Sequence, residues 1–283
     1  MIVMTANRSF GRDIFIYLAS DLAVSIGGGF TNPTFTKTTF LDSLDVLITH
    51  DSPLGVYKIS NDRKQIQRTQ DPLLPGDYEV ESDGYIEVTD SKYYHRTSSA
   101  MSSLSASGRV RSFPAAVRDR DRKCVITGLS MTQRELFQQR WTKYETAHIF
   151  PVALEAILPN YSFGKLAVLD ELDGTVNSPQ NGLLLQRTVH GLFDQYEISI
   201  NPNDEYRITP GHPHHVNDNI LFWHFQQAVL ANMRGAGEPI FDEDIPRGSD
   251  ALDAIRSAPA QRMEFELSNR LGDVMRAQGS LLI

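Results

Sequence analysis

The stretch between residues 144 and 194 constrains the fold most, because its composition changes over a short distance from strand-like to turn-like to helix-like. Residues 144–150 have strand composition and run into Pro151, which cannot donate a hydrogen bond to a sheet and therefore tends to close a strand. This pattern predicts that His148 lies at the end of a strand. Residues 177–182 are dense in Asn, Pro and Gly, which is typical of a turn.

Apolar residues follow this turn and predict a helix over residues 183–195. His190 and Asp194 are four positions apart on that helix, so their side chains are expected on one face. An imidazole and a carboxylate placed in this way can share one divalent cation, and His148 can enter the same cleft from the strand. The cation would polarise a phosphate, and a neutral His148 would take a proton from an attacking water.

The order His148, Asn181-Gly182, His190, Asp194 resembles the HNH nuclease superfamily and its ββα-metal motif. Four short motifs are similar to those of the branch of HNH proteins found in many copies in fungi. They are Cys-Val-Ile-Thr-Gly at residues 124–128, Ala-His-Ile-x-Pro, Asn-Gly-Leu-x-Leu and His-x-x-Phe-Asp. The resemblance covers about residues 118–201. It implies a metal-dependent endonuclease that hydrolyses phosphodiester bonds of nucleic acid, with DNA favoured as the substrate.

The resemblance also implies a role for each of the four site residues. His148 would be the general base that activates water, and Asn181 would hold the loop between strand and helix. His190 and Asp194 would be ligands of one divalent metal ion. Mg²⁺ or Mn²⁺ is favoured, with Zn²⁺ and Ni²⁺ as alternatives, because two ligands of these types do not distinguish the metals.

The sequence departs from the family pattern immediately before the expected base. Many HNH nucleases carry an Asp or His ligand at this position, and here it is Ala147. Glu145 shares a strand face with Ala147 and is an accessory candidate, whose plain alternative is a solvated strand residue. The departure leaves two alternatives open: an HNH fold that has lost its chemistry and serves as a binding or scaffold module, or one repurposed for acid and base chemistry on a small molecule.

Charge is unevenly distributed along the chain, whose formal net charge is −8. An acidic protein is an unusual partner for nucleic acid, since Lys and Arg supply most of the affinity for phosphate. Residues 96–123, however, contain seven basic residues against two acidic ones. The candidates for phosphate contact in this segment are Arg118, Arg120, Arg122 and Lys123. The alternative is a solvated helix end with alternating ion pairs.

The predicted fold class is α+β, with a small β-rich N-terminal domain and a later ββα-metal domain. Residues 1–95 form the N-terminal domain, in which two strands are followed by a helix and then by further strands, as in a β-grasp fold. The helix is expected over residues 39–48, with Thr38 or Thr39 as its N-cap. The triple glycine at residues 27–29 is expected in a turn or bulge.

A serine-rich linker is predicted over residues 96–111 and the nuclease-like domain over residues 112–283. That domain would begin with a helix capped by Ser112, which leads to a strand at residues 124–126. Amphipathic helices over residues 251–277 would extend it and could mediate assembly of a homo-oligomer.

The sequence predicts an intracellular protein, located in the cytoplasm or the nucleus. Cys124 is the single cysteine, which excludes an intramolecular disulfide and a paired-cysteine zinc site. No segment has the composition of a signal peptide or the length of a transmembrane span, so no membrane partner is expected.

Overall fold

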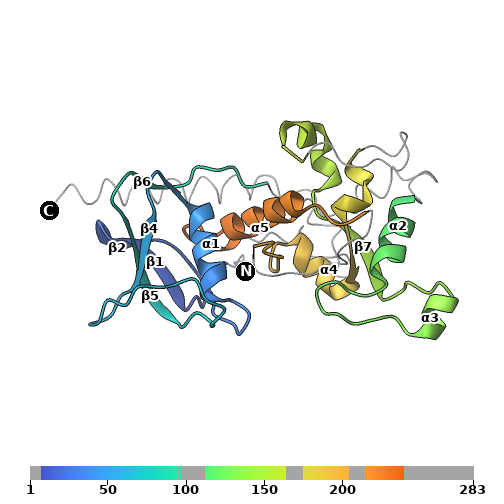
Figure 1. The fold of residues 1–283 in the computed structure, drawn as a ribbon, viewed down its shortest axis with the longest axis horizontal. Helices are drawn as coiled ribbons and strands as arrows, with labels where there is room; N and C mark the ends of the chain where they lie inside the picture. Colours follow the sequence, from blue (N-terminus) through green and yellow to red (C-terminus); the bar gives the residue numbers. More distant parts are fainter. Residues whose placement is uncertain (1–7, 95, 97–111, 164–174, 204–213, 239–283) are drawn as a thin grey trace, which may run out of the picture.

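The computed structural model describes residues 8–94, 96, 112–163, 175–203 and 214–238. It is a mixed α+β structure with an N-terminal β-sheet part and a later part of short strands and helices (Figure 1). Helix α5, Asp218–Met233, lies between the two parts.

The N-terminal part is built on a four-stranded sheet in the order β2-β1-β5-β4. The central strands β1 and β5 run parallel, and the outer strands β2 and β4 are antiparallel to their neighbours. Strands β3 and β6 form a separate antiparallel pair. The elements of this part are β1 Ile14–Leu18, β2 Asp21–Gly29, α1 Lys37–Leu47, β3 Ile48–His50, β4 Leu54–Lys58, β5 Gly76–Ser82 and β6 Ile86–Val88.

Helix α1 begins two residues earlier than the sequence predicts. The side chain of Thr36 accepts a hydrogen bond from the backbone N–H of Thr39 at 3.0 Å, so Thr36 is the N-cap, and the expected cap at Thr38 or Thr39 is wrong. Phe40 and Leu44 of this helix are fully buried against the sheet.

The triple glycine is part of strand β2, so the expectation of a turn at residues 27–29 is wrong. The alternative of a bulge is closer, because the β1–β2 register shifts between Ile16, which pairs with Gly27, and Tyr17, which pairs with Ser25. These glycines pair with β1, and Gly27 also forms a bridge with Arg234, just after α5. A Cβ atom on Gly27 would collide with the backbone of Met233. Glycine is therefore required because the end of α5 approaches this strand closely.

The later part contains an antiparallel hairpin-like pair, β7 Tyr144–His148 and β8 Gly182–Gln186, covered by two helices. Its other elements are α2 Ser112–Asp121, α3 Gln133–Phe137, α4 Arg187–Asp194 and the 3₁₀ turns η2 Val152–Asn160, η3 Thr175–Asn177 and η4 Pro179–Asn181. In the β7–β8 register His148 lies opposite Gly182.

Two expectations about this part are wrong. Residues 183–186 belong to a strand, and the helix starts at Arg187. The run at residues 183–185 is fully buried on both faces of the strand pair. The prediction failed because a short apolar run does not by itself distinguish a strand from a helix. Residues 124–126 form a turn, closed by a hydrogen bond from the N–H of Gly128 to the carbonyl of Cys124 at 2.8 Å.

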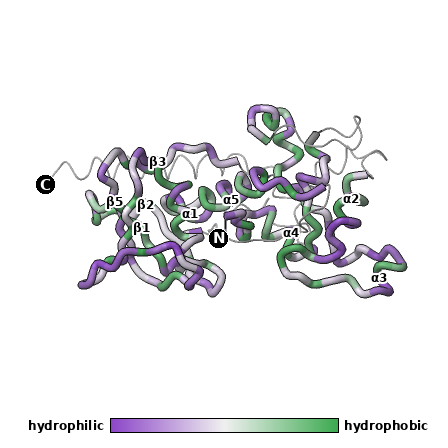
Figure 2. Tube along the Cα trace, viewed as in Figure 1, coloured by the Kyte–Doolittle hydropathy of each residue, from purple (hydrophilic) through white to green (hydrophobic). Residues whose placement is uncertain are grey.

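Helix α5 contributes to both hydrophobic cores. Its first half places Ile220, Leu221 and Trp223 in the core around β7 and β8. Its second half places Phe225, Val229 and Met233 in the core between α1 and the N-terminal sheet. Figure 2 shows hydrophobic segments in both α1 and α5, which contact each other. A helix that is apolar around its circumference is expected to be buried on all sides.

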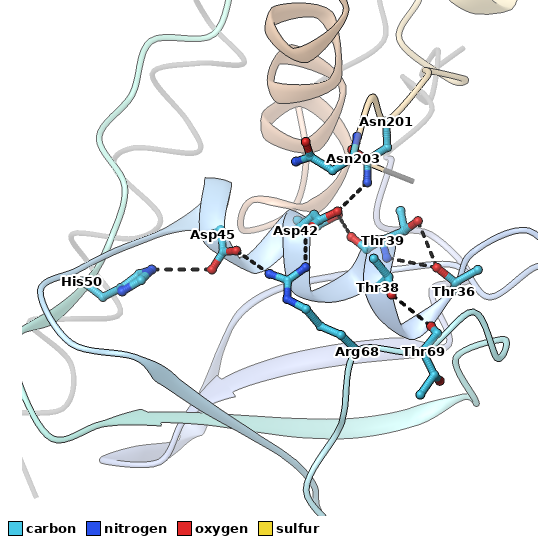
Figure 3. Close-up of polar contacts among 11 residues, drawn as sticks. Thr36, Thr38, Thr39, Asp42, Asp45, His50, Arg68, Thr69, Asn201 and Asn203 are labelled. Atoms are coloured by element: carbon cyan, nitrogen blue, oxygen red, sulfur yellow. Dashed lines mark hydrogen bonds and ion pairs between the residues drawn. The ribbon is translucent and has the colours of Figure 1, made fainter. Parts of the chain in front are cut away.

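A buried carboxylate also joins the two parts (Figure 3). Asp42 of α1 is 5% exposed, pairs with Arg68 and accepts a hydrogen bond from Asn201 Nδ2 at 2.7 Å. Arg68 Nη2 also lies 2.9 Å from Asp45 Oδ2. The N-terminal helix is therefore tied to the chain beyond α4 by polar contacts as well as by α5.

Some expectations fall outside this part of the chain. The serine-rich segment at residues 97–108 and the predicted helices at residues 251–277 lie outside the described residues. Among the helices that are described, none combines the length and apolar character needed to cross a membrane.

Candidate active site

The expected site residues come from three adjacent elements. His148 is the last residue of β7, Asn181 directly precedes β8, and His190 and Asp194 lie one turn apart on α4, which packs on both strands. His190 Nε2 lies 3.2 Å from Asp194 Oδ2, as the four-residue spacing predicts. His148 is electrostatically coupled to both residues.

His190 is held between two carboxylates, one at each ring nitrogen. Its Nδ1 atom lies 2.9 Å from Glu145 Oε2, and its Nε2 atom faces Asp194. Glu145 therefore reaches toward α4 from its position on β7. A carboxylate on the far nitrogen of an imidazole is the usual partner of a metal-binding histidine, because it fixes the tautomer and orients the ring.

Each of the two carboxylates that contact His190 also pairs with an arginine. Arg187 Nε lies 2.9 Å from Glu145 Oε1, and Arg96 Nη2 lies 2.9 Å from Asp194 Oδ1. The side chains thus form a chain of alternating charge, Arg187, Glu145, His190, Asp194, Arg96. The Arg96 side chain is 6% exposed.

No motif in the sequence marks Arg96 as a site residue. It stands at the start of the predicted linker, and the structure places it in the site instead. Its guanidinium donates to the carbonyls of His148 at 2.6 Å and Ile149 at 3.1 Å, in addition to its ion pair. Only the excess of basic residues in this segment hinted at a function for it.

The charges around α4 shift the pKa values of His190 and Asp194 in opposite directions. Burial alone would lower the pKa of His190, but the hydrogen bonds and charges of Asp194 and Glu145 outweigh burial and raise it. Burial alone would raise the pKa of Asp194, but Arg96 and then His190 lower it to about 2. Both shifts favour the charged forms, an imidazolium at His190 and a carboxylate at Asp194.

His148 has a different environment. Its ring stacks on Phe113 of α2, with 4.2 Å between centroids and 12° between planes, and its Nε2 atom lies 3.0 Å from Asn177 Oδ1. Burial lowers the pKa of His148 to about 4. The imidazole is therefore neutral at physiological pH, which a proton acceptor requires.

Asn181 is fully buried, and its amide is bonded only to backbone. Its Oδ1 accepts from the N–H of Phe150 at 2.7 Å, and its Nδ2 donates to the carbonyls of Phe150 at 3.0 Å and Val176 at 2.8 Å. These bonds join the chain after β7 to the chain before β8. The structure thus places Asn181 between two loops rather than between strand and helix.

The four basic candidates, two on α2 and two directly after it, differ in environment. Arg120 is fully buried, bonded to Asp121 and to the carbonyls of Pro179, Gly182 and His214. Arg120 is therefore not available for phosphate contact, because its N–H donors are used within the protein. Arg118 lies over the Trp141 ring, and burial lowers its pKa. Arg122 is exposed and pairs with Asp119, and Lys123 is exposed.

The donors near α4 fit a cation that also keeps water or substrate ligands. Within the described ranges, no group of three or more His, Cys, Asp or Glu side chains is arranged to hold a metal ion. His190 Nε2 and Asp194 Oδ2 supply one imidazole nitrogen and one carboxylate oxygen that lie 3.2 Å apart. Such a donor pair fits Mg²⁺ or Mn²⁺, which retain waters and bind substrate phosphate directly.

Comparison with known protein families divides the chain in the same way as the fold. Residues 11–87 match a family described only as a domain of unknown function (DUF8573). Residues 124–201 match an HNH endonuclease family, a class of domain that acts on nucleic acid. No curated protein and no solved structure matches the chain. The strand pair, α4 and the residues His148, Asn181, His190 and Asp194 fall within the second match, and residues 124–201 are therefore an HNH endonuclease domain.

Proposed function

We propose that this protein is a metal-dependent endonuclease that hydrolyses phosphodiester bonds of nucleic acid. The observation that carries the proposal is the position of His190 and Asp194, which aim a nitrogen and an oxygen at one point beside a neutral His148. Glu145 supports it by orienting His190 from the other side of the ring.

Each residue has a distinct task in this proposal. His190 Nε2 and Asp194 Oδ2 hold the metal, and His148 takes the proton of the attacking water. The bound metal would supply Lewis-acid polarisation of the scissile phosphate and charge stabilisation at the leaving oxygen. Asn181 fixes the loops on either side of the strand pair, and Arg96 holds the end of β7 through the carbonyl of His148.

DNA is the favoured substrate, and phosphate contacts would come from exposed basic residues near the site. Arg122, Lys123 and Arg187 are exposed, and Arg118 lies on α2, which ends directly before Arg122. Because the net charge of the chain is −8, binding relies on these local contacts and should weaken steeply with salt.

The test is incubation of the purified protein with supercoiled plasmid and each of Mg²⁺, Mn²⁺, Zn²⁺ and Ni²⁺. The wild type should nick or linearise the plasmid in at least one metal, and EDTA should stop the reaction. His148→Ala should reduce cleavage by at least about 100-fold, because general base catalysis contributes roughly that much or more.

His215→Ala is the matched control, since it removes a histidine of the same domain without touching the site. Cleavage that survives His148→Ala, with the variant free of contaminating nuclease, would overturn the proposal.

A second function is favoured by two observations: an HNH domain that binds a partner without cleaving it. Ala147 is fully buried where many HNH nucleases carry a ligand, and Arg96 occupies one oxygen of Asp194. Calorimetry with Mn²⁺ distinguishes the two functions. Binding that is lost in His190→Ala supports the nuclease, and the absence of any heat together with no cleavage supports the binding module.

We propose that the N-terminal sheet is β-grasp-like and that the domains follow the boundaries 1–95, 96–111 and 112–283. The sheet order β2-β1-β5-β4, with a parallel central pair and α1 between the second and third strands of the chain, supports the first point.

A further inference from the structure

The environment of His148 contains two side chains that the order of motifs does not point to. Asn177 precedes Asn181 by four residues, and Phe113 lies on α2, before the HNH match begins. Both contact the His148 ring directly, and neither is placed to touch the metal pair on α4.

We propose that Asn177 sets the tautomer of His148 and that Phe113 sets the plane of its ring, so that Nδ1 is the nitrogen that accepts the proton. The inference rests on the proposed function, because it names which atom of the general base does the work. Asn177 and Phe113 are positioning residues in this proposal, since they act through His148.

The first step is the hydrogen bond at Nε2. Asn177 Oδ1 is a carbonyl oxygen and can only accept, so at 3.0 Å the Nε2 atom of His148 must be the donor. A neutral imidazole carries one proton. When that proton is on Nε2, the lone pair is on Nδ1, which makes no hydrogen bond to the described residues.

The second step is the fixed orientation of the ring. The Phe113 ring lies parallel to the imidazole, and Phe113 is 1% exposed, held against Gly182 of β8. The His148 backbone is fixed as well, because its carbonyl accepts from Arg96. Rotation of the ring out of its plane would break the stack, and a half-turn flip would keep the stack but break the hydrogen bond at Nε2.

The third step explains why two asparagines are needed in the same loop. The amide of Asn181 is committed to the backbone of Phe150 and Val176. Its bond to Val176 secures the 3₁₀ turn whose last residue is Asn177. Asn181 therefore holds the loop, and Asn177 uses that loop to reach His148.

The test compares Asn177→Leu, which keeps the approximate size but removes the acceptor, with Asn177→Asp, which keeps an acceptor oxygen. Asn160→Leu is the matched control, because Asn160 is exposed on η2. The ring ¹⁵N chemical shifts of His148 in the metal-free protein at pH 8 report the tautomer. Circular dichroism checks that each variant is folded.

We expect a proton on Nε2 in the wild type, in Asn177→Asp and in the control, and converging ¹⁵N shifts in Asn177→Leu as both tautomers become populated. In plasmid cleavage we expect kcat to fall about 10-fold or more in Asn177→Leu with KM unchanged, since removing a partner that orients a catalytic or metal-bound imidazole costs on the order of 10- to 100-fold. Asn177→Asp should recover part of this loss.

A proton on Nδ1 in the wild type, or unchanged ¹⁵N shifts in Asn177→Leu, would overturn the inference. Loss of kcat to the same extent in Asn177→Asp and Asn177→Leu would also overturn it. The NMR result does not require cleavage. A wild type that has the Nε2 proton but cleaves nothing would therefore refute the proposed function and leave the tautomer assignment intact.

Discussion

At the scale of single residues, the pair His190 and Asp194 presents a problem of charge. A neutral imidazole lone pair directed at a carboxylate is repelled by it, so a proton or a cation must lie between Nε2 and Oδ2. The raised pKa of His190 reflects the proton in the metal-free protein. A metal ion at the same position must displace that proton.

This competition predicts that metal affinity depends on pH. The pKa of His190 is raised, so below that pKa each metal ion bound releases one proton, and affinity should fall about tenfold for each unit of decrease in pH. Above the raised pKa, affinity should level off. Calorimetric titration with Mn²⁺ between pH 5 and 9 checks this.

The control for this experiment is Glu145→Gln, which removes the charge at Nδ1. The pKa of His190 should then be lower, and the fall in affinity should begin at a lower pH. An affinity that does not change with pH in the wild type would contradict a metal at Nε2.

At the scale of elements, the contact of α2 with β8 determines where His148 lies. Gly182 has an ordinary strand φ of −128°, so its backbone does not demand glycine. The reason is space, because a Cβ atom would lie 2.6 Å from Val117 Cγ2 and 2.7 Å from Phe113 Cε2. The Asn-Gly motif therefore combines a loop brace at Asn181 with a surface on which Phe113 can lie.

Gly182→Ala should destabilise the protein by about 1–3 kcal/mol, which is typical of overpacking a core. Because Phe113 stacks on His148, its displacement should also lower cleavage activity. Urea denaturation measures the free energy of unfolding, and plasmid cleavage measures activity. Gly29→Ala is the control in a strand where a Cβ would meet only ordinary contacts, at 3.7 Å or more. Equal effects of the two substitutions would contradict the steric explanation.

At the scale of the whole molecule, α5 makes the two parts one cooperative structure. One half of the helix fills the HNH core and the other half fills the core of the N-terminal sheet. Asp42 and Arg96 add polar contacts between segments far apart in the chain. Neither part can lose α5 without exposing its core.

A substitution in the N-terminal core should therefore destabilise the HNH part as well. Leu44→Ala should cost about 2–5 kcal/mol, because Leu44 is fully buried. Trp141 and Trp223, the two tryptophans of the chain, pack in or against the HNH core, so tryptophan fluorescence reports mainly that part. The urea midpoint from fluorescence should shift as far as the midpoint from circular dichroism.

Leu74→Ala, at a residue that is 62% exposed in the same N-terminal part, is the control and should shift neither midpoint. A fluorescence transition that stays in place in Leu44→Ala would show that the two parts unfold independently.

The sequence by itself determined the local features of the site. The four-residue spacing of His190 and Asp194 places their side chains together on any helix, and Pro151 disfavours continuation of the preceding strand, so the contact of these two residues and the position of His148 near a strand end follow from neighbouring residues. The α+β class and the division into two parts follow similarly from changes in composition along the chain. The run at residues 183–185 was assigned to the wrong element, because an apolar segment of that length suits either a strand or a helix.

Only the tertiary structure decided which side chains complete the site. Arg96, Asn177 and Phe113 reach the histidines from segments separated by tens of residues, and no local pattern marks them. Glu145 was a candidate from strand periodicity, but only the structure shows that it pairs with His190. The physical reason is that ion pairs, stacking and hydrogen bonds depend on the distance between atoms in space. That distance is set by how α2, α4 and the strand pair pack together.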